Sequence, residues 1–302
     1  MQKNITIIGV ASDYGASITG SDKGADSIRE SGLRASLETL KHKIEDLGNI
    51  TPSLITPHAT KAPPNNLKNL DIINDVNTKL FKAVTQALKN NSFPLTLGGD
   101  HSLSAGSVPA VQQHYGNIGV IWVDAHGDFN DAESSPSGNI HGMSFSAAVT
   151  GEPCQILPFL SAPIPLDPKN CVLFGARDLD KAEAVRLKKS GVTVIEMPEI
   201  QSNENAAIEK AVRIAGNTTN GIYLSFDLDS LDPSISPAVG TPVANGITES
   251  AALSLFDALK SSKKLLGAEF TELNPLKDKD NKTARLAVKL ISTLFAPAKQ
   301  KI

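Results

Sequence analysis

The chain has 302 residues, of which 40% are hydrophobic, so it can form one large α/β domain or two small ones. Its formal net charge of −3 at pH 7 argues against nucleic-acid binding and against adsorption to a membrane surface. Because the chain has no signal segment, no apolar run of about 20 residues and only two cysteines, we expect a cytoplasmic protein without disulfide bonds.

Short β-rich segments alternate with helical patterns along the whole sequence. Strands are predicted for residues 5–10, 43–47, 94–97, 118–123, 172–175, 192–195, 222–226 and 265–270. Residues 71–90 form the clearest helical pattern, with apolar side chains at three- and four-residue spacing, and residues 251–260 and 283–294 read similarly. Residues 49–68 and 157–170 lack periodicity, and we interpret them as surface excursions because the alternation resumes after each.

This alternation of strands and helices predicts an α/β fold. Consecutive strand–helix–strand units build a parallel sheet that is covered by helices on both faces. Because neither aperiodic stretch interrupts the pattern for long, we expect a single domain over residues 1–302. In such sheets ligands bind beyond the carboxyl ends of the strands, so functional residues are expected directly after them.

Polar segments follow four of the predicted strands. They read GGDHS at residues 98–102, DAHGDFN at 124–130, DLDSLDP at 227–233 and TELNP at 271–275. Each segment contains carboxylate or imidazole side chains, which are common in metal sites and in acid–base catalysis. The sequence therefore concentrates its chemically active side chains at one edge of the predicted sheet.

The spacing within two of these segments suggests that their carboxylates converge. In extended backbone, alternate side chains point to the same face, so Asp124, His126 and Asp128 would share one direction. Asp227 and Asp229 would do the same on another strand. Four carboxylates that close would repel one another strongly unless cations lay among them. Divalent metal ions are the natural compensation.

The six candidate ligands favour two ions over one. They are His101, Asp124, His126, Asp128, Asp227 and Asp229. Around a single ion they would leave no open position for chemistry, whereas two ions that share carboxylates leave room for a bridging water. Four oxygen donors with two imidazoles and no thiolate favour Mn²⁺ over Fe²⁺, Co²⁺ or Zn²⁺, and Mg²⁺ ranks lower because it usually avoids histidine.

Each segment also has a simpler interpretation when it is taken alone. An Asp-x-His pair is common by chance, and GGDH can be a turn in which Asp100 or Ser102 caps a helix. An Asp-x-Asp pair after a strand can bind a Mg²⁺–phosphate group or cap its own loop. Their joint occurrence at the strand ends of one parallel sheet is hard to explain without metal.

Three segments, GGDHS, DAHGDFN and SFDLDSLDP, resemble in this order the ureohydrolase family, which includes arginase and agmatinase. The similarity extends to TELNP, over nearly the whole chain. It implies an eight-stranded parallel sheet flanked by helices on both faces, and two Mn²⁺ per chain. By this resemblance one Mn²⁺ would be held by His101, Asp124, Asp128 and Asp227. The other would be held by Asp124, His126, Asp227 and Asp229, with Asp124 and Asp227 bridging.

The loop after the second segment resembles the arginase branch of that family. By this resemblance Asn130 and Ser137 would receive the α-carboxylate of the substrate, and Asp180 in GARDLD would contact its α-ammonium group. The alternative for Asp180 is N-capping of a helix over residues 181–189. Thr241 in GTPV would line the same pocket. Agmatine has no carboxylate to place there.

The resemblance also implies catalytic roles for Asp128, His141 and Glu272. His141 would shuttle a proton, Glu272 would hold the guanidinium group, and Asp128 would orient a metal-bridging hydroxide. The alternatives are a hydrogen-bonded polar residue for His141 and an exposed loop acid for Glu272. Gly127 departs from the threonine that is frequent at its position in the family.

The predicted activity is that of a hydrolase that converts L-arginine to L-ornithine and urea. Another ureohydrolase activity, on agmatine or a guanidino acid, is the first alternative. A metal-dependent binding protein that has lost catalysis is the second. The expected partner is a small-molecule substrate, with no nucleic acid and no membrane, and the resemblance implies a homo-oligomer, a trimer or hexamer.

Overall fold

The computed structural model describes residues 2–160, 164–217 and 219–297. Its eight strands form one parallel sheet in the order β2-β1-β3-β8-β7-β4-β5-β6. The strands are β1 Asn4–Val10, β2 Lys43–Ile50, β3 Phe93–Leu97, β4 Gly119–Val123, β5 Cys171–Ala176, β6 Thr193–Glu196, β7 Ile222–Asp227 and β8 Leu265–Thr271. This confirms the predicted α/β fold class, and each of the eight predicted segments lies in or overlaps a strand.

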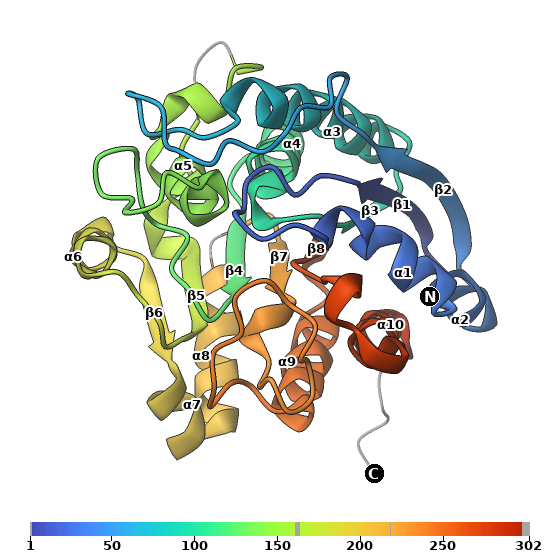
Figure 1. Cartoon of the computed structure of the whole chain (residues 1–302). Helices are drawn as coiled ribbons and strands as arrows, with labels where there is room; N and C mark the ends of the chain where they lie inside the picture. The colour runs from blue at the N-terminus through green and yellow to red at the C-terminus, as the bar shows by residue number, and fades with distance from the viewer. Residues whose placement is uncertain (1, 161–163, 218, 298–302) are drawn as a thin grey trace.

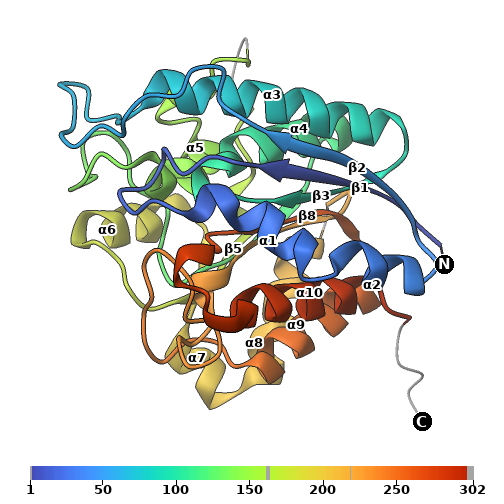
Figure 2. The same cartoon turned by 45° about the vertical axis from the view of Figure 1, so that its right-hand side comes forward.

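Ten α-helices within the described residues cover both faces of this sheet (Figures 1 and 2). They are α1 Gly24–Glu30, α2 Leu33–Thr39, α3 Leu70–Lys89, α4 Ser104–Tyr115, α5 Ser144–Thr150, α6 Lys181–Ser190, α7 Met197–Ser202, α8 Glu204–Gly216, α9 Glu249–Ser262 and α10 Lys282–Phe295. Helices α3, α4 and α5 lie over one face, and α1, α2, α8, α9 and α10 lie over the other.

The apolar runs of the strands follow from this three-layer arrangement. In β4, Ile121 and Val123 pack into the core on one face, while Val120 and Trp122 pack into the core on the other. All five residues of β4 are buried. A strand with both faces covered has no solvent-facing positions, and its sequence is therefore continuously hydrophobic.

The three predicted helices are confirmed as α3, α9 and α10, each within two residues of its predicted ends. The structure agrees only in part with the two stretches predicted to be surface excursions, residues 49–68 and 157–170. Residues 51–69 form a loop before α3, but residues 49 and 50 belong to β2. Residues 161–163 lie outside the described part of the chain, and the stretch ends in a 3-10 helix, Pro168–Asn170.

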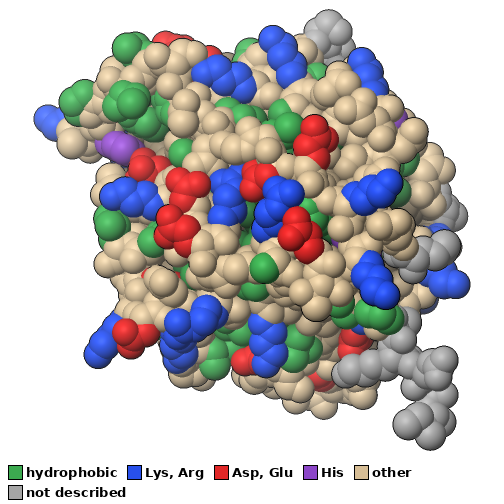
Figure 3. Space-filling view, turned by 90° about the vertical axis from the view of Figure 1, so that its right-hand side faces the viewer, with side chains coloured by type: hydrophobic (Ala, Val, Ile, Leu, Met, Phe, Trp, Pro, Cys, Tyr) green, Lys and Arg blue, Asp and Glu red, His purple; other side chains and the backbone are tan. Residues whose placement is uncertain are grey.

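The surface is mixed in character. On the face shown in Figure 3, acidic and basic side chains are interleaved, with hydrophobic side chains scattered between them. Among the described residues, no helix is both long enough and apolar enough to cross a membrane.

The strand register brings four polar segments to one place. Leu97 of β3, Phe270 of β8, Phe226 of β7 and Val123 of β4 form a continuous row across the middle of the sheet. The four strands end at this row or one residue beyond it, so the segments that follow them leave the sheet at the same edge. The loop after β3 passes close to the loop after β1, since a Cβ on Gly99 would lie 2.3 Å from the carbonyl oxygen of Ser12. Only glycine fits such a backbone approach.

Candidate active site

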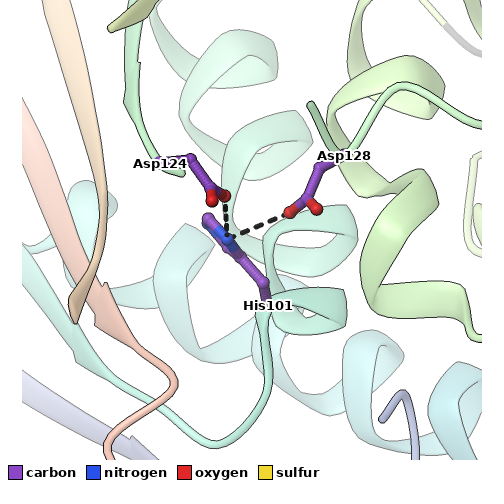
Figure 4. Close-up of side chains that lie close together, drawn as sticks. All are labelled: His101, Asp124 and Asp128. Carbon is purple, nitrogen blue, oxygen red and sulfur yellow. Dashed lines mark ion pairs between the residues drawn. The ribbon is translucent and has the colours of Figure 1, made fainter. Parts of the chain in front are cut away.

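His101 stands at the centre of a buried group of carboxylates. Its Nδ1 lies 3.1 Å from Oδ2 of Asp124, 3.0 Å from Oδ2 of Asp128 and 3.0 Å from Oδ2 of Asp227. Figure 4 shows the ring with the carboxylates of Asp124 and Asp128 directed toward this nitrogen. His101 follows β3, Asp124 and Asp128 follow β4, and Asp227 ends β7. The strand ends therefore converge as the sequence predicts.

A second group lies on the other side of Asp124. His126 Nδ1 is 3.4 Å from Oδ1 of Asp124 and 3.2 Å from Oδ2 of Asp229. The hydroxyl of Thr241 donates a hydrogen bond of 2.9 Å to the same Asp229 oxygen. Asp124 thus presents one oxygen to each group. Both groups, His101–Asp124–Asp128 and Asp124–His126–Asp229, have a spacing that could hold a metal ion.

The crowding of these carboxylates perturbs their pKa values. Burial, with the charges of Asp229 and Asp124, raises the pKa of Asp227 well above its usual value. Burial and the charge of Asp124 likewise raise the pKa of Asp128 to about 6. Burial alone would raise the pKa of Asp124 as well, but His101 and His126 outweigh it and lower that pKa, so the two histidines compensate only part of the negative charge of the site.

Ten buried side-chain polar atoms in the described part of the chain make no hydrogen bond, and three of them lie close together here: His101 Nδ1, Asp128 Oδ2 and Asp229 Oδ1. Buried polar atoms are rarely left without a partner, and those that are point to a missing ion or ligand. All three atoms belong to the two groups above. Four carboxylates and two imidazoles without a thiolate are donors suited to a hard or borderline divalent cation. The residues present therefore fit a metal centre.

The backbone path to this centre differs from the sequence-based expectation. We expected the extended alternation of β4 to continue through Asp128, but the chain bends at residues 125–126 and Asp128 is left-handed, with φ 48°. Asp229 likewise lies in a 3-10 helix, Leu228–Ser230, whose N-cap is Asp227. The ligand side chains do converge as expected, but loop and 3-10 backbone brings them together rather than extended strand. A left-handed aspartate costs about 1–3 kcal/mol and is typical of functional sites.

His141 and Glu272 form an ion pair beside the carboxylate groups. His141 Nδ1 lies 3.0 Å from Oε1 of Glu272, which also accepts the backbone N–H of His101 at 2.9 Å. Burial lowers the pKa of His141, but the hydrogen bond and charge of Glu272 outweigh it and raise that pKa to about 9. Glu272 is 2% exposed, so it is not the exposed loop acid of the alternative interpretation. Its Oε2 accepts no hydrogen bond from the described residues.

One pocket of about 160 Å³ connects these groups with the proposed substrate residues. Every predicted site residue except Asp124, which lies beneath it, lines this pocket. Asn130 and Asp180 meet within it, because the side-chain amide of Asn130 donates a 3.0 Å hydrogen bond to Oδ2 of Asp180. Asp180 also caps α6, so the capping alternative for this residue is confirmed, although capping does not exclude a contact with substrate.

Glu183 is a pocket residue that was not predicted from the sequence. Its carboxylate accepts the backbone N–H groups of Phe129 and Asp180, so it ties the loop after β4 to the start of α6. Burial raises the pKa of Glu183 to about 7. Gly127 leaves the space that Glu183 fills, since a Cβ at Gly127 would lie 2.5 Å from its Cδ. The Asp-x-x-Glu capping box of residues 180–183 was the available signal.

Comparison with known proteins agrees with this geometry. The sequence matches the Arginase family model over residues 3–296. It is 41% identical to the arginase of Brevibacillus brevis over 297 residues, which cover 98% of both chains. The crystal structure of Bacillus caldovelox arginase superposes with a TM-score of 0.93 at 39% identity, covering 99% of this chain and all of that one. Entamoeba histolytica arginase in complex with L-ornithine gives a TM-score of 0.89 at 29% identity, covering 98% of this chain and all of that one.

A parallel β-sheet flanked by helices, with two His–Asp groups at its carboxyl edge, is the arrangement of a metal-dependent hydrolase of the ureohydrolase type. The chain belongs to the arginase family. It is an amidinohydrolase, an enzyme that hydrolyses linear C–N bonds of amidines.

Proposed function

We propose that this enzyme hydrolyses L-arginine to L-ornithine and urea. The observation that carries the proposal is the composition of the pocket above the metal groups. Neutral donors, Asn130 and Ser137, lie there beside the acids Asp180 and Glu183. An α-amino acid needs this combination, because its carboxylate requires donors and its ammonium group requires acceptors. Agmatine has no carboxylate to accept from these donors, and Asn130 would keep its hydrogen bond to Asp180.

The proposed metal centre contains two Mn²⁺ ions. We assign His101, Asp124, Asp128 and Asp227 to the first ion, and Asp124, His126, Asp227 and Asp229 to the second. The position of Asp124 between the two groups, with one oxygen directed to each, supports its bridging role. When bound, the two ions would supply hydroxide at neutral pH by lowering the pKa of a water that they share.

Asp128 and Glu272 would position the reactants. Asp128 accepts a hydrogen bond from the attacking oxygen and directs it at the guanidinium carbon. Glu272 receives the guanidinium group through Oε2, because Oε1 is already hydrogen-bonded to His141 and to the backbone of His101. Charge-assisted hydrogen bonds to a guanidinium are directional, so this contact would fix the plane of the reacting group.

His141 would deliver the proton to the departing amine. The Glu272 ion pair supports this role, since a pKa of about 9 keeps the ring protonated at neutral pH. The ring is partly exposed in the pocket, at 20% for the side chain, and so is within reach of a bound substrate. Nδ1 would keep its proton in the hydrogen bond to Glu272, so Nε2 would give its proton to the amine and then regain one from solvent.

The substrate head group would contact three residues. Asn130 and Ser137 donate to the α-carboxylate, and Asp180 accepts from the α-ammonium group. Without substrate, Asn130 donates to Asp180, so the two residues would exchange this contact for contacts with the substrate. Thr241 lines the pocket but donates to Asp229, which points to support of a metal ligand.

The test is urea release from L-arginine, agmatine and 4-guanidinobutyrate by the Mn²⁺-loaded enzyme. We expect turnover of arginine and little of the other two. Turnover of agmatine or of the guanidino acid without turnover of arginine would reject the proposal in favour of another ureohydrolase activity. Location in the cytoplasm and assembly into a trimer or hexamer stay predictions from sequence. Size-exclusion chromatography with light scattering measures the assembly.

A further inference from the structure

Glu269 is a fully buried carboxylate in the middle of β8, at 0% exposure. It accepts hydrogen bonds from four hydroxyl groups: Ser104, Ser107, Tyr223 and Ser225. No lysine or arginine among the described residues pairs with it. A buried charge is costly unless its lone pairs are satisfied, and four donors match the capacity of two carboxylate oxygens. Because burying a charge in the core costs free energy, Glu269 is expected to have a function beyond packing.

The register of the sheet explains how these groups meet. Ser225 of β7 lies beside Glu269 of β8, and Trp122 of β4 lies on the other side of Ser225. Helix α4 covers this row and contributes Ser104 and Ser107, which are one turn apart. His101, the proposed ligand, begins the 3-10 helix His101–Leu103 that leads into α4, and it stacks on Trp122 with ring centroids 4.2 Å apart. The carboxylate therefore lies behind the metal groups, on the core side.

The hydroxyl of Ser225 connects Glu269 to His101 through two hydrogen bonds. The hydroxyl of Ser225 donates its only proton to Oε1 of Glu269 at 2.7 Å. Its contact of 2.7 Å with Nε2 of His101 must then be one in which the ring nitrogen donates. With the proton held on Nε2, the opposite nitrogen, Nδ1, is the one available as a lone pair. Nδ1 is the atom that faces Asp124, Asp128 and Asp227.

Tyr223 also donates a hydrogen bond to Glu269, but it is not part of the connection to His101. Its hydroxyl donates to Oε2 of Glu269 at 2.8 Å and does not contact His101. Burial, followed by the charge of Glu269, raises the pKa of Tyr223 well above its usual value, so the hydroxyl keeps its proton. Tyr223 and Ser225 thus bind the same carboxylate through different oxygens, and only Ser225 leads to the metal centre.

We propose that Glu269 is a positioning residue for the metal centre. It holds the hydroxyl of Ser225 as an acceptor, and Ser225 in turn holds the proton of His101 on Nε2 and directs Nδ1 to the metal. The inference rests on the proposed metal centre and goes beyond it, because Glu269 touches neither metal nor substrate. The competing role is a purely structural tie between α4, β7 and β8.

The test measures metal affinity in the full chain without substrate. We call the chain of hydrogen bonds from Glu269 through Ser225 to His101 the relay. Variants Glu269→Gln and Ser225→Ala break this relay. Tyr223→Phe removes another hydrogen bond to Glu269 but leaves the relay intact. Titration of metal-free protein with Mn²⁺, followed by the electron paramagnetic resonance signal of free Mn²⁺, gives the Kd. We expect the first two variants to bind 10- to 100-fold more weakly, as is typical for partners of ligating histidines, and Tyr223→Phe to stay within about threefold of wild type.

A double variant separates the relay from a structural role. If Glu269 acts through Ser225, Glu269→Gln combined with Ser225→Ala loses no more affinity than the weaker-binding single variant. Additive losses, or an equal loss in Tyr223→Phe, would mean a general structural effect and overturn the proposal. Unchanged affinity in Ser225→Ala would also overturn it, and this variant serves if Glu269→Gln does not fold.

A second readout reports on the proton itself. In protein labelled with ¹⁵N-histidine and loaded with diamagnetic Zn²⁺, we expect a slowly exchanging Nε2–H signal from His101 in wild type and Tyr223→Phe. The signal should be lost in Ser225→Ala. A wild-type spectrum with metal on Nε2 would reject the relay. Failure of arginine turnover with normal Mn²⁺ binding would reject only the proposed substrate, whereas absence of Mn²⁺ binding would reject both the centre and the relay.

Discussion

The side-chain amide of Asn130 donates a 3.0 Å hydrogen bond to Oδ2 of Asp180. This bond joins the loop after β4 to the N-cap of α6, two segments that lie 50 residues apart in the chain. It also places a neutral donor and an acid side by side in the pocket. The pair is therefore the feature that would distinguish an α-amino acid from other guanidino compounds.

Changing Asn130 to Asp should weaken the binding of arginine selectively. The new carboxylate would face both Asp180 and the substrate carboxylate, and a lost hydrogen bond to a charged group costs about 1.5–3 kcal/mol. We expect the KM for L-arginine to rise at least about tenfold, with a smaller effect on any agmatine turnover. Asn203→Asp, which adds the same charge at the N-cap of α8, is the control. Equal losses for both compounds would argue against a carboxylate contact.

A methyl group at position 127 should disturb the pocket through Glu183. The added Cβ would lie 2.5 Å from Cδ and 2.6 Å from Oε1 of Glu183, which could then no longer hold Phe129 and Asp180. We expect Gly127→Ala to lower the free energy of unfolding by about 1–2 kcal/mol, the scale of a lost helix cap, and to raise the KM for arginine. Urea denaturation measures the first effect.

Gly142→Ala is the control, because its Cβ would meet no atom within 4 Å. If Gly127→Ala were as stable as this control, Glu183 would not depend on the absent side chain.

The ion pair of His141 and Glu272 predicts a pH dependence of stability in metal-free protein. The folded-state pKa of about 9 lies above the ordinary value of 6.5, so the pair stabilises fully below pH 6.5 and its contribution is lost as pH rises through 9. Glu272→Gln should therefore be less stable than wild type at pH 6, with a difference that shrinks by pH 10. Denaturation curves at several pH values measure this trend.

NMR titration of the His141 ring gives an independent check. Its pKa should fall toward 6.5 in Glu272→Gln. A pKa near 6.5 already in wild type would remove the basis for a protonated His141 at neutral pH.

Removal of one carboxylate should separate catalysis from folding. Asp128→Asn removes a charge from the first metal group, where Asp128 Oδ2 has no other hydrogen-bond partner among the described residues. We expect urea release to fall at least about a hundredfold while the far-UV circular dichroism spectrum stays unchanged. Asp131→Asn, in the same loop but paired with Arg186 outside the pocket, should keep its turnover.

Mn²⁺ should also stabilise the wild-type fold, by about 2.7 kcal/mol at 100 times its Kd, and stabilise Asp128→Asn less. Equal stabilisation of both proteins would place the ion elsewhere.

Local sequence patterns predict the strands of the sheet and the side chains at its carboxyl edge. Strands β4 and β7 are buried on both faces, so their residues are apolar apart from Ser225, and the change to acidic residues at Asp124 and Asp227 marks their ends. Parallel pairing then brings these ends to one edge, whatever the details of the loops. These are local or topological features, and local patterns suffice to read them.

The way in which the side chains converge depends on the packing of the whole fold. Asp128 and Glu272 have left-handed backbones, with φ of 48° and 66°, and neither has the glycine that marks such a position in a sequence. Glu183 and Glu269 act through partners on other elements, at positions set by loop packing and strand register. Contacts of this kind depend on the whole fold, because each partner is placed by a different segment. The sequence therefore determined which groups reach the site, and the packed structure decided their geometry.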